Sequence, residues 1–442
     1  MKAPPPTRNM ALDRLLAERA SAPIRVGMVG AGAAARAIAL QLVGSTPGIR
    51  LVAIANRTVA NARRAFAEAG DPPVVEVSTG EQLDRAVSIG RCAVTADATA
   101  LITSHLIQAI IEVTGTVEYA AHVVTTAVEH RKHVVLVNAE LDATVGPILA
   151  RRAAEHGVVL TNTDGDEPGV AMTLLRYLRS LGLRPVAAGN LKGLVDHYRT
   201  PETQRAFAER HGQNPQKAAS FADATKLSME ATVLANATGF RVGKRGMYGP
   251  SCPDVREIAT RLPADEMLSS GLVDYALDTA PYTGAFVIVH EPDPRKQRLL
   301  SYGKLGAGPF YVFYTPFHLP HLQITSTIAR AVLLHDPTVC PLDAGSPVCE
   351  TIAIAKRDLR AGEQLDGVGG FCTYGLIDNA DAAAAADALP MGVAEGCRLT
   401  RDVPRDTALT YADVELPADR LIDELRREQQ ATLVSTAPSR EP

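Results

Sequence analysis

The stretch IRVGMVGAGAAARAIALQLV, residues 24–43, constrains the fold of this chain more than any other. An apolar run typical of a strand ends at Gly30, and alanine-rich helix formers come after it. The spacing is GxGxxA, in which the first glycine permits a tight turn and the second lets a pyrophosphate approach the backbone, while the small third residue lets helix and strand pack closely. The predicted phosphate contacts are Gly30, Ala31, Gly32, Ala33 and Ala34.

The role of this turn depends on the neighbouring elements, because a glycine turn of this kind can also be purely structural. The next segments, IRLVAIANRT, VANARRAFAEAG, IQAIIEVTG, VEYAAHVVTTAVEHRKH and HVVLVNAE, alternate short apolar strands with helices. Such alternation predicts a doubly wound parallel sheet with helices on both faces, a Rossmann fold. Phosphates would then bind the unsatisfied N–H groups at the first helix N-terminus.

The ends of the next strands predict the rest of the cofactor site, because ligands of open α/β sheets bind beyond the carboxyl ends of the strands. The second strand ends in Asn56 and Arg57, without the acid that usually holds the ribose hydroxyls of NAD. A guanidinium suits a 2′-phosphate, so NADPH is favoured over NAD. The nicotinamide pocket is expected at the ends of the next strands, and the alternative is ordinary turn chemistry. Its candidate residues are Thr114, Gly115, Asn138 and Glu140.

The pattern changes from RPVAAGNLKG onward, where strands are separated by long connections rich in Gly and Pro. This indicates an α+β domain built on an open sheet, and from about Glu350 a third pattern of short strands and turns begins. The predicted division is an N-terminal extension (1–22), a Rossmann domain (23–165), a catalytic and dimerisation domain (166–345), a small β-rich domain (346–430) and a disordered tail (431–442).

Composition excludes several function classes. The net charge is −4 with interspersed signs, aromatic residues make up 5% and tryptophan is absent, so a nucleic-acid partner is not expected. Six scattered cysteines without CxxC spacing indicate reduced thiols. No apolar run is long enough to span a bilayer, so we expect no membrane association and a cytoplasmic protein.

The segment VVLTNTDGDEPGV raises a chemical question, because a strand runs into Asp164, Asp166 and Glu167. Buried carboxylates need cations, donors or water. The sequence offers two lysines: Lys192 at the end of the next strand, and Lys226 in TKLSMEATVL.

We expect these groups to form the catalytic site. TKLSMEATVL is predicted to be a strand, which would place Glu230 on the same face as Lys226. Hydride delivery to a carbonyl needs a proton donor and support for the developing alkoxide. Lys192 would fill these roles, Lys226 would bind substrate, and Asp164 and Glu167 would orient the lysines or hold substrate hydroxyls. The competing interpretations are surface lysines and acids that cap a helix starting near Gly169.

A divalent metal enters only if the reaction includes an isomerisation. Asp166 and Glu230 would then hold Mg or Mn, which prefer oxygen ligands. The spacing itself carries no metal signature.

Several stretches together resemble the homoserine dehydrogenase-like oxidoreductases, and most closely their deoxyxylulose phosphate reductoisomerase-like branch. The resemblance runs from about Ile24 to Gln430, and its most specific pieces are TDGDEPG, SMEATVLANATG and YGKLGAGPFYVFYTPFHL. The segment from Glu350 resembles a SAF module. The resemblance implies an NADPH-binding Rossmann domain, a central catalytic and dimerisation domain, a small C-terminal domain and a homodimer.

One departure concerns the strand-end asparagine. Homoserine dehydrogenases have a lysine after it, whereas this chain has Ala139 and Glu140 after Asn138. The leading hypothesis is therefore an NAD(P)H-dependent oxidoreductase that acts on a small polar carbonyl or polyol, phosphorylated or not, with or without a coupled isomerisation. The alternatives are a redox-neutral epimerase or isomerase with bound nucleotide, and a non-catalytic nucleotide-sensing dimer.

Overall fold

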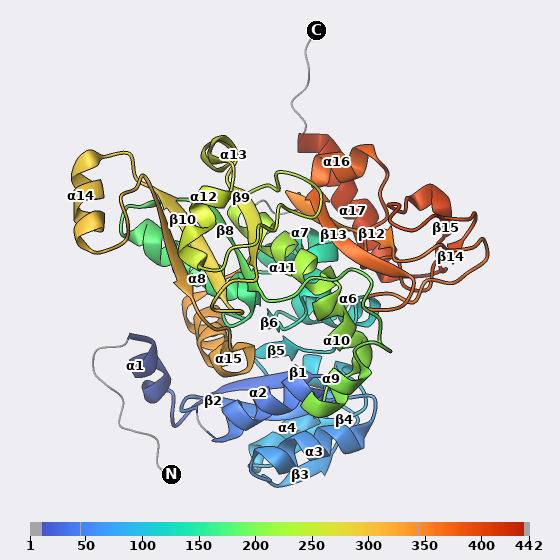
Figure 1. The fold of residues 1–442 in the computed structure, drawn as a ribbon. Helices are drawn as coiled ribbons and strands as arrows, with labels where there is room; N and C mark the ends of the chain where they lie inside the picture. The colour runs from blue at the N-terminus through green and yellow to red at the C-terminus, as the bar shows by residue number, and fades with distance from the viewer. Residues whose placement is uncertain (1–10, 45, 343–344, 437–442) are drawn as a thin grey trace. The chain divides into compact units, whose positions relative to one another are not determined.

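The computed structural model describes residues 11–44, 46–342 and 345–436 (Figure 1). The chain divides into two compact units, each assembled from separate stretches. The first comprises Met1–Leu141, Ile148–Asp166 and Leu319–Cys340, and the second comprises Asp142–Pro147, Glu167–His318 and Pro341–Pro442.

The first unit is built on a seven-stranded sheet in the order β3-β4-β2-β1-β5-β6-β7, in which every neighbouring pair is parallel. Strands β2, β3 and β4 lie on one side of β1, whereas β5, β6 and β7 lie on the other, so the order reverses between β1 and β5. The strands are β1 (Ile24–Val29), β2 (Ile49–Ala55), β3 (Val74–Glu76), β4 (Cys92–Thr95), β5 (Ala109–Glu112), β6 (His133–Leu136) and β7 (Leu160–Asn162).

Helices cover both faces of this sheet. Val26 and Met28 of β1 share a core with residues of α2, α3 and α15, whereas a Cβ on Gly27 would contact Leu101 of α5 on the other face. The helices of this unit are α1 (Ala11–Glu18), α2 (Ala33–Gly44), α3 (Val59–Ala69), α4 (Gly80–Ser88), α5 (Thr99–Ile102), α6 (Glu118–Glu129), α15 (Pro320–Ala329) and the π-helical turn η2 (Arg330–Leu334); α7 (Ala139–Glu155) contributes residues to both units.

The second unit contains a mixed four-stranded sheet in the order β11-β10-β8-β9. Helices α8 and α11 pack on it, and a core formed with Val255, Ile258 and Met267 brings in η1, α12 and α13. These elements are α8 (Glu167–Ser180), β8 (Arg184–Lys192), α9 (Arg205–His211), α10 (Pro215–Ala222), α11 (Thr225–Thr238), η1 (Val255–Glu257), α12 (Ile258–Arg261), α13 (Ala264–Ser269), β9 (Leu272–Leu277), β10 (Ala285–His290), α14 (Pro294–Tyr302) and β11 (Phe310–Thr315).

The segment TKLSMEATVL is a helix, and its prediction as a strand is wrong. It forms most of α11, whose fourteen residues are all buried. A helix buried on every side has no polar face, so the amphipathic period that marks surface helices is missing from its sequence. Gly239 ends it with φ +79, a left-handed conformation that glycine adopts without strain.

The C-terminal part of the second unit consists of short strands and turns. Its elements are β12 (Cys349–Ala355), β13 (Thr373–Asn379), α16 (Ala380–Ala385), β14 (Arg398–Leu399), η3 (Tyr411–Asp413), β15 (Val414–Glu415) and α17 (Leu421–Thr436). The similar segments DLRAGEQL and DVPRDTALT pair with each other, because Leu359 and Val403 exchange both backbone hydrogen bonds. Helix α17 includes the start of the predicted disordered tail, and residues 437–442 lie outside the described residues.

The predicted fold class is confirmed, with a parallel Rossmann-type sheet, a mixed open sheet and a small β-rich part. Among the described helices, none combines the length and the apolarity that a membrane crossing requires.

Candidate functional site

The glycine turn of the first unit lies at the carboxyl end of β1, next to the point where the strand order reverses. Gly30 has φ +117, and a Cβ there would lie 2.9 Å from the carbonyl oxygen of Val113, just after β5. Any side chain at this position would therefore clash with the neighbouring strand end. The turn needs glycine for the reason that the sequence indicated.

The start of α2 offers an anion-binding surface. Gly32, Ala33 and Ala34 are exposed, whereas Ala31 and Ala35 are buried, the latter against the sheet. The first N–H groups of a helix have no partner within the helix and carry the positive end of its dipole. Small exposed residues leave these groups accessible, and the phosphate contacts expected here stay a prediction.

The end of β2 carries the residues expected near the adenosine ribose. The side-chain amide of Asn56 donates to the carbonyl oxygen of Thr58 at 2.9 Å and so shapes this turn. Arg57 is exposed at its tip. No carboxylate stands at Asn56 or Arg57, where an NAD site usually has one.

A buried glutamate that the sequence analysis did not single out connects the next two strand ends. Glu112, the last residue of β5, accepts hydrogen bonds from the backbone N–H of Thr114 at 2.8 Å and from Asn138 Nδ2 at 2.7 Å. Burial raises the pKa of its carboxyl group, and the hydrogen bonds from Thr114 and Asn138 act in the opposite direction. Glu112 therefore fixes two of the predicted nicotinamide residues, and its place at the end of an apolar strand was the available signal.

The remaining predicted residues of this edge lie close by in the chain. Gly115 has φ +65 and turns the backbone after Thr114. Asn138 is the N-cap of α7, where its side-chain oxygen accepts from the N–H of Leu141 at 3.1 Å. Glu140 is half-buried in the first turn of that helix.

In the second unit, three elements bring the predicted lysines and acids together. Lys192 is the last residue of β8, Glu167 is the first residue of α8, and Lys226 and Glu230 lie one turn apart on α11. Because α8 and α11 both pack on β8 and on each other, these side chains meet. On a helix, residues four apart share a face, so Lys226 and Glu230 are neighbours although the predicted strand is absent.

The ammonium group of Lys192 stands between two carboxylates. Its Nζ lies 2.9 Å from Glu167 Oε1 and 3.6 Å from Glu230 Oε2. Lys226 Nζ lies 3.8 Å from Glu230 Oε1. The two glutamate side chains are 5% and 3% exposed, whereas Lys192 keeps 20% of its surface accessible. Lys192 is thus the most exposed of these four side chains, since Lys226 is 11% exposed.

The charge of Glu167 is strongly favoured. Burial alone would raise its pKa, but the charges of Lys192 and His318 outweigh burial and lower the pKa to about 2. His318 Nδ1 lies 3.5 Å from Glu167 Oε1 and 3.0 Å from the hydroxyl of Thr283. The sequence analysis did not include His318 among the site residues, because no local spacing links it to Glu167.

Asn190 is a further member that the sequence analysis did not single out. Its Nδ2 donates to Glu230 Oε2 at 3.0 Å, and the residue is buried. It precedes Lys192 by two positions, which places both on one face of β8. This period could have revealed it.

The loop Thr163–Asp166 explains the glycine among the acids. Asp164 accepts from Ser326 Oγ at 3.0 Å, and its N–H donates to Thr327 Oγ1 at 2.9 Å, both on α15. Gly165 approaches the same region so closely that a Cβ would lie 2.5 Å from the carbonyl oxygen of Leu319. Asp164 therefore holds the loop against α15, and its predicted role beside the lysines stays a prediction.

The three acids Asp164, Asp166 and Glu167 differ in their surroundings. Burial raises the pKa of Asp164, whose hydrogen bonds to Ser326 and Thr327 act in the opposite direction. Asp166 is buried directly before Glu167, which begins α8 two residues earlier than expected. Glu167 and Glu230 each have a carboxylate oxygen within 4.8 Å of the other. Such a pair can hold an ammonium group or accept substrate hydroxyls.

Two family models match the chain. Residues 30–161 match the NAD-binding domain of homoserine dehydrogenase, and residues 165–324 match the catalytic domain of the oxidoreductase DRL. The first range contains the glycine turn and the Glu112 network, and the second contains Glu167, Lys192 and Glu230. No curated protein matches the chain.

Three solved structures that match the chain are distantly similar to it. A putative myo-inositol dehydrogenase from Sinorhizobium meliloti 1021 is 12% identical, with a TM-score of 0.40 over 73% of this chain and 92% of that chain. A homoserine dehydrogenase from Thiobacillus denitrificans is 17% identical, with a TM-score of 0.39 over 71% and 74%. A scyllo-inositol dehydrogenase from Lactobacillus casei, solved with NAD(H) and scyllo-inositol, is 13% identical, with a TM-score of 0.35 over 60% and 73%.

Proposed function

Because the chain is an NAD(P)-dependent oxidoreductase that joins a homoserine dehydrogenase-type NAD-binding domain to a DRL-type catalytic domain, we propose that it transfers a hydride between nicotinamide and a small polar carbonyl or polyol. The observation that carries this proposal is the ammonium group of Lys192, partly exposed between two buried carboxylates. A nucleotide sensor without chemistry has no need for such a group.

The residues of the second unit can support this chemistry directly. As hydride reaches the carbonyl carbon, the π electrons move to oxygen, and the Lys192 ammonium stabilises the alkoxide and donates its proton. Glu167 and Glu230 favour the charged lysine and fix its direction. Lys226, on the other side of Glu230, would bind an anionic substituent such as a phosphate.

Replacement of Lys192 tests the proposal. Lys192→Ala should lower kcat on the order of 10²–10³-fold, the usual cost of removing one group that stabilises a developing oxyanion, while the affinity for NADPH stays the same. The measurement is NADPH oxidation against a panel of ketoses, aldehydes and their phosphates. Lys296→Ala is the matched control, because Lys296 also pairs with a buried glutamate, Glu291, at 3.2 Å.

The results separate net reduction from the redox-neutral alternative. Full activity in Lys192→Ala would exclude the assigned role. If no compound in the panel oxidises NADPH but the bound nucleotide cycles between oxidised and reduced forms during epimerisation of a polyol, the redox-neutral alternative replaces the net reduction.

We propose NADPH rather than NADH as the preferred cofactor. The support is the exposed guanidinium of Arg57 at the end of β2 and the absence of a carboxylate at Asn56 and Arg57. Arg57→Ala should weaken NADPH binding by about tenfold, the value of one charge-assisted contact, and leave NADH binding unchanged. Fluorescence titration with both nucleotides measures this, and an equal loss for both would contradict it.

A divalent ion belongs to the proposal only for a coupled isomerisation. Asp166 and Glu230 would then be its ligands, because carboxylate oxygens suit Mg and Mn. The ion would polarise substrate oxygens during the rearrangement. Dialysis against EDTA should then abolish the isomerisation and Mg or Mn should restore it; unchanged turnover would exclude the ion.

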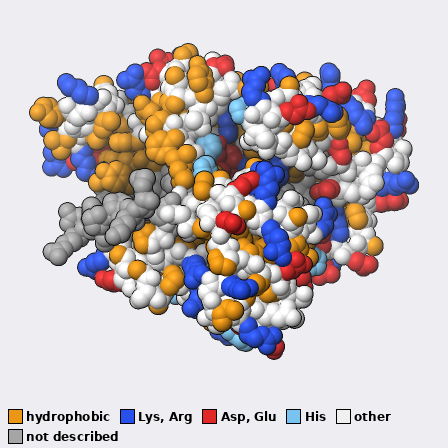
Figure 2. Space-filling view, turned by 90° about the horizontal axis from the view of Figure 1, so that it is seen from below, with side chains coloured by type: hydrophobic (Ala, Val, Ile, Leu, Met, Phe, Trp, Pro, Cys, Tyr) orange, Lys and Arg blue, Asp and Glu red, His pale blue; other side chains and the backbone are white. Residues whose placement is uncertain are grey.

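We also propose a homodimer, formed through the edge of the four-stranded sheet. Strand β11 ends that sheet, and an edge strand offers unpaired N–H and C=O groups to a second chain. Leu299 and Tyr302, on α14 in the connection between β10 and β11, are 70% and 87% exposed. Figure 2 shows hydrophobic side chains gathered on its left, the side on which α14 lies in Figure 1.

We propose the cytoplasm as the location of the protein. The support is that its six cysteines are thiols and form no disulfide framework.

A further inference from the structure

The C-terminal module, defined here as residues 346–430, packs its hairpin β12–β13 on α11. It therefore lies against the helix that carries Lys226 and Glu230. Hydrogen bonds cross this contact, among them those of Thr232 with Thr351, Gly375 with Thr225, and Cys349 with Asn236. The module is in direct contact with a part of the proposed site.

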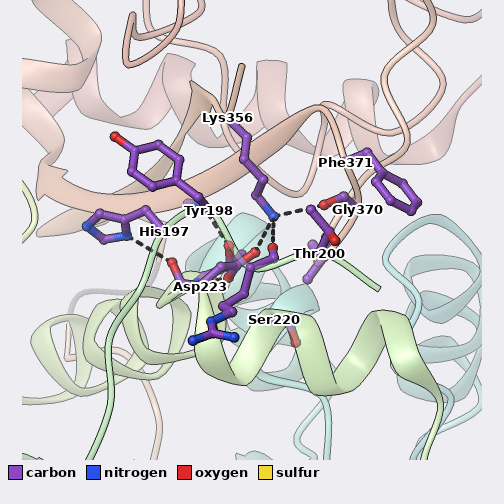
Figure 3. Close-up of polar contacts among 12 residues, drawn as sticks. His197, Tyr198, Thr200, Ser220, Asp223, Lys356, Gly370 and Phe371 are labelled. Atoms are coloured by element: carbon purple, nitrogen blue, oxygen red, sulfur yellow. Dashed lines mark hydrogen bonds and ion pairs between the residues drawn. The ribbon is translucent and has the colours of Figure 1, made fainter. Parts of the chain in front are cut away.

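Lys356, the residue after β12, extends from this hairpin into a polar cluster (Figure 3). Its Nζ donates to Asp223 Oδ2 at 2.8 Å, to the carbonyl oxygen of Arg199 at 2.7 Å and to that of Gly370 at 2.8 Å. These bonds use all three donors of the ammonium group. The side chains of Lys356 and Asp223 are 3% and 0% exposed.

Asp223 also binds the start of α11. Its Oδ1 accepts from the N–H of Thr225 at 2.8 Å, and Lys226 is the next residue. Burial raises the pKa of its carboxyl group, and the charge of Lys356 acts in the opposite direction. The carboxylate thus binds the module through one oxygen and the helix through the other.

The same cluster holds the segment that comes after Lys192. Arg199 supplies one acceptor to Lys356, and the N–H of Asp196 donates to the carbonyl oxygen of Ala222 at 2.9 Å. His197 Nδ1 pairs with the carbonyl oxygen of Asp223 at 2.9 Å, and its ring stacks on Tyr374 of β13 at 4.6 Å. Segments 193–200 and 222–230 therefore share their supports.

We propose that Lys356 is a positioning residue, which ties the segment after Lys192 and the start of α11 to the C-terminal module and so holds the catalytic ammonium–carboxylate cluster in place. This proposal rests on the catalytic role of Lys192 given above. A buried ion pair by itself contributes little net stability, whereas one that joins three segments fixes their mutual geometry.

A second buried ion pair in the same module provides the matched control. Arg426 donates to both carboxylate oxygens of Glu350, at 2.6 and 3.1 Å, and the two side chains are 3% and 7% exposed. Arg426 also donates to the carbonyl oxygen of Thr144. These partners lie outside residues 193–230, so the loss of Arg426 should destabilise the module without loosening those segments.

The experiment compares Lys356→Met and Arg426→Met in the full chain. One readout is hydrogen exchange of peptides covering 193–204 and 222–230. The other is the acetylation rate of Lys192 with an N-hydroxysuccinimide ester, followed by mass spectrometry. Lys356→Met should raise both rates by about fivefold, as expected when local protection is lost, and Arg426→Met should leave both as in the wild type. Equal behaviour of the two variants, or no change in Lys356→Met, would overturn the proposal.

A double variant covers the case in which Lys356→Met fails to fold. Asp223→Asn with Lys356→Met leaves no unpaired buried charge and keeps an oxygen to cap Thr225, so it should fold. Its exchange and labelling rates should still be raised, because the carbonyl groups of Arg199 and Gly370 have lost their donor. Wild-type rates in this variant would refute the positioning role.

The labelling readout needs neither substrate nor cofactor. Lys192→Ala with full activity would remove the proposed function but leave the structural link intact. Unchanged labelling in Lys356→Met would remove the link but leave the proposed function intact.

Discussion

The charge of Glu167 depends on the residues that surround it. Glu167 is the first residue of α8, and its carboxylate faces Lys192 and His318. The sequence could predict the acid, the glycine and the lysine, because each ends or begins an element recognisable from its own residues. It could not predict His318 as a partner, since that contact depends on how distant segments pack, whereas the period of β8 could have revealed Asn190.

The depressed pKa of Glu167 gives a pH dependence. Its folded-state pKa of about 2 lies below the ordinary 4.5. The contribution of its charge to the unfolding free energy is therefore complete above the ordinary value and is lost as the pH falls toward the folded-state value. Denaturant unfolding across pH should show the gap between wild type and Glu167→Gln largest at neutral pH and closing in acid.

The matched variant for this measurement is Glu155→Gln. Glu155 is an exposed carboxylate that pairs with Arg151 one turn away, so its removal should leave the wild-type pH profile. A gap that stays constant for Glu167→Gln over the same range would show that the Lys192 and His318 charges do not act on this residue as described.

At the scale of elements, most of the parallel sheet was predictable, because short apolar runs alternate with longer helical segments. Helix α11 was not. Its Lys226 and Glu230 are four apart, a spacing that places two residues on one face of a strand as well as of a helix. Lys226 and Glu230 are therefore neighbours although the segment was assigned to a strand. The packing of α11 on β8, β9, β12 and β13 determines that the segment is a helix.

The complete burial of α11 predicts sensitivity to volume. Ala235 is fully buried, so Ala235→Leu should lower the unfolding free energy by about 1–3 kcal/mol, the usual cost of overpacking a core. Ala384→Leu, at an exposed position of α16, should cost little. Chemical denaturation measures both, and equal stability of the two variants would argue against a buried α11.

For the whole molecule, the sequence indicated a Rossmann part and further modules after it, and the structure has a Rossmann-type sheet in the first of two units. The sequence did not indicate that α15, far along the chain, shares the core of α2 and α3. The sequence does not indicate which core Ile324 and Ile328 join, because apolar periodicity shows that a helix face is buried and not what covers it. The three-domain division stays a prediction.

The proposed dimer is tested at this scale. Leu299→Asp with Tyr302→Asp should convert a dimer into a monomer, because two charges would have to be buried in the proposed interface. Light scattering after size-exclusion chromatography gives the mass. Ile89→Asp, at a residue 74% exposed in the first unit, should leave the mass unchanged. A wild-type monomer, or a double variant that stays dimeric, would exclude this interface.

The interleaved membership of the two units limits how this gene can be rearranged. A fragment that stops at Asp166 would contain the complete parallel sheet but lack α15, and the apolar side chains beneath that helix would meet water. Neither nucleotide binding nor catalysis can therefore be transplanted as one uninterrupted cassette. A chimera that exchanges only residues 167–318 must carry two junctions, one on either side of that range, and return to the original parent for α15.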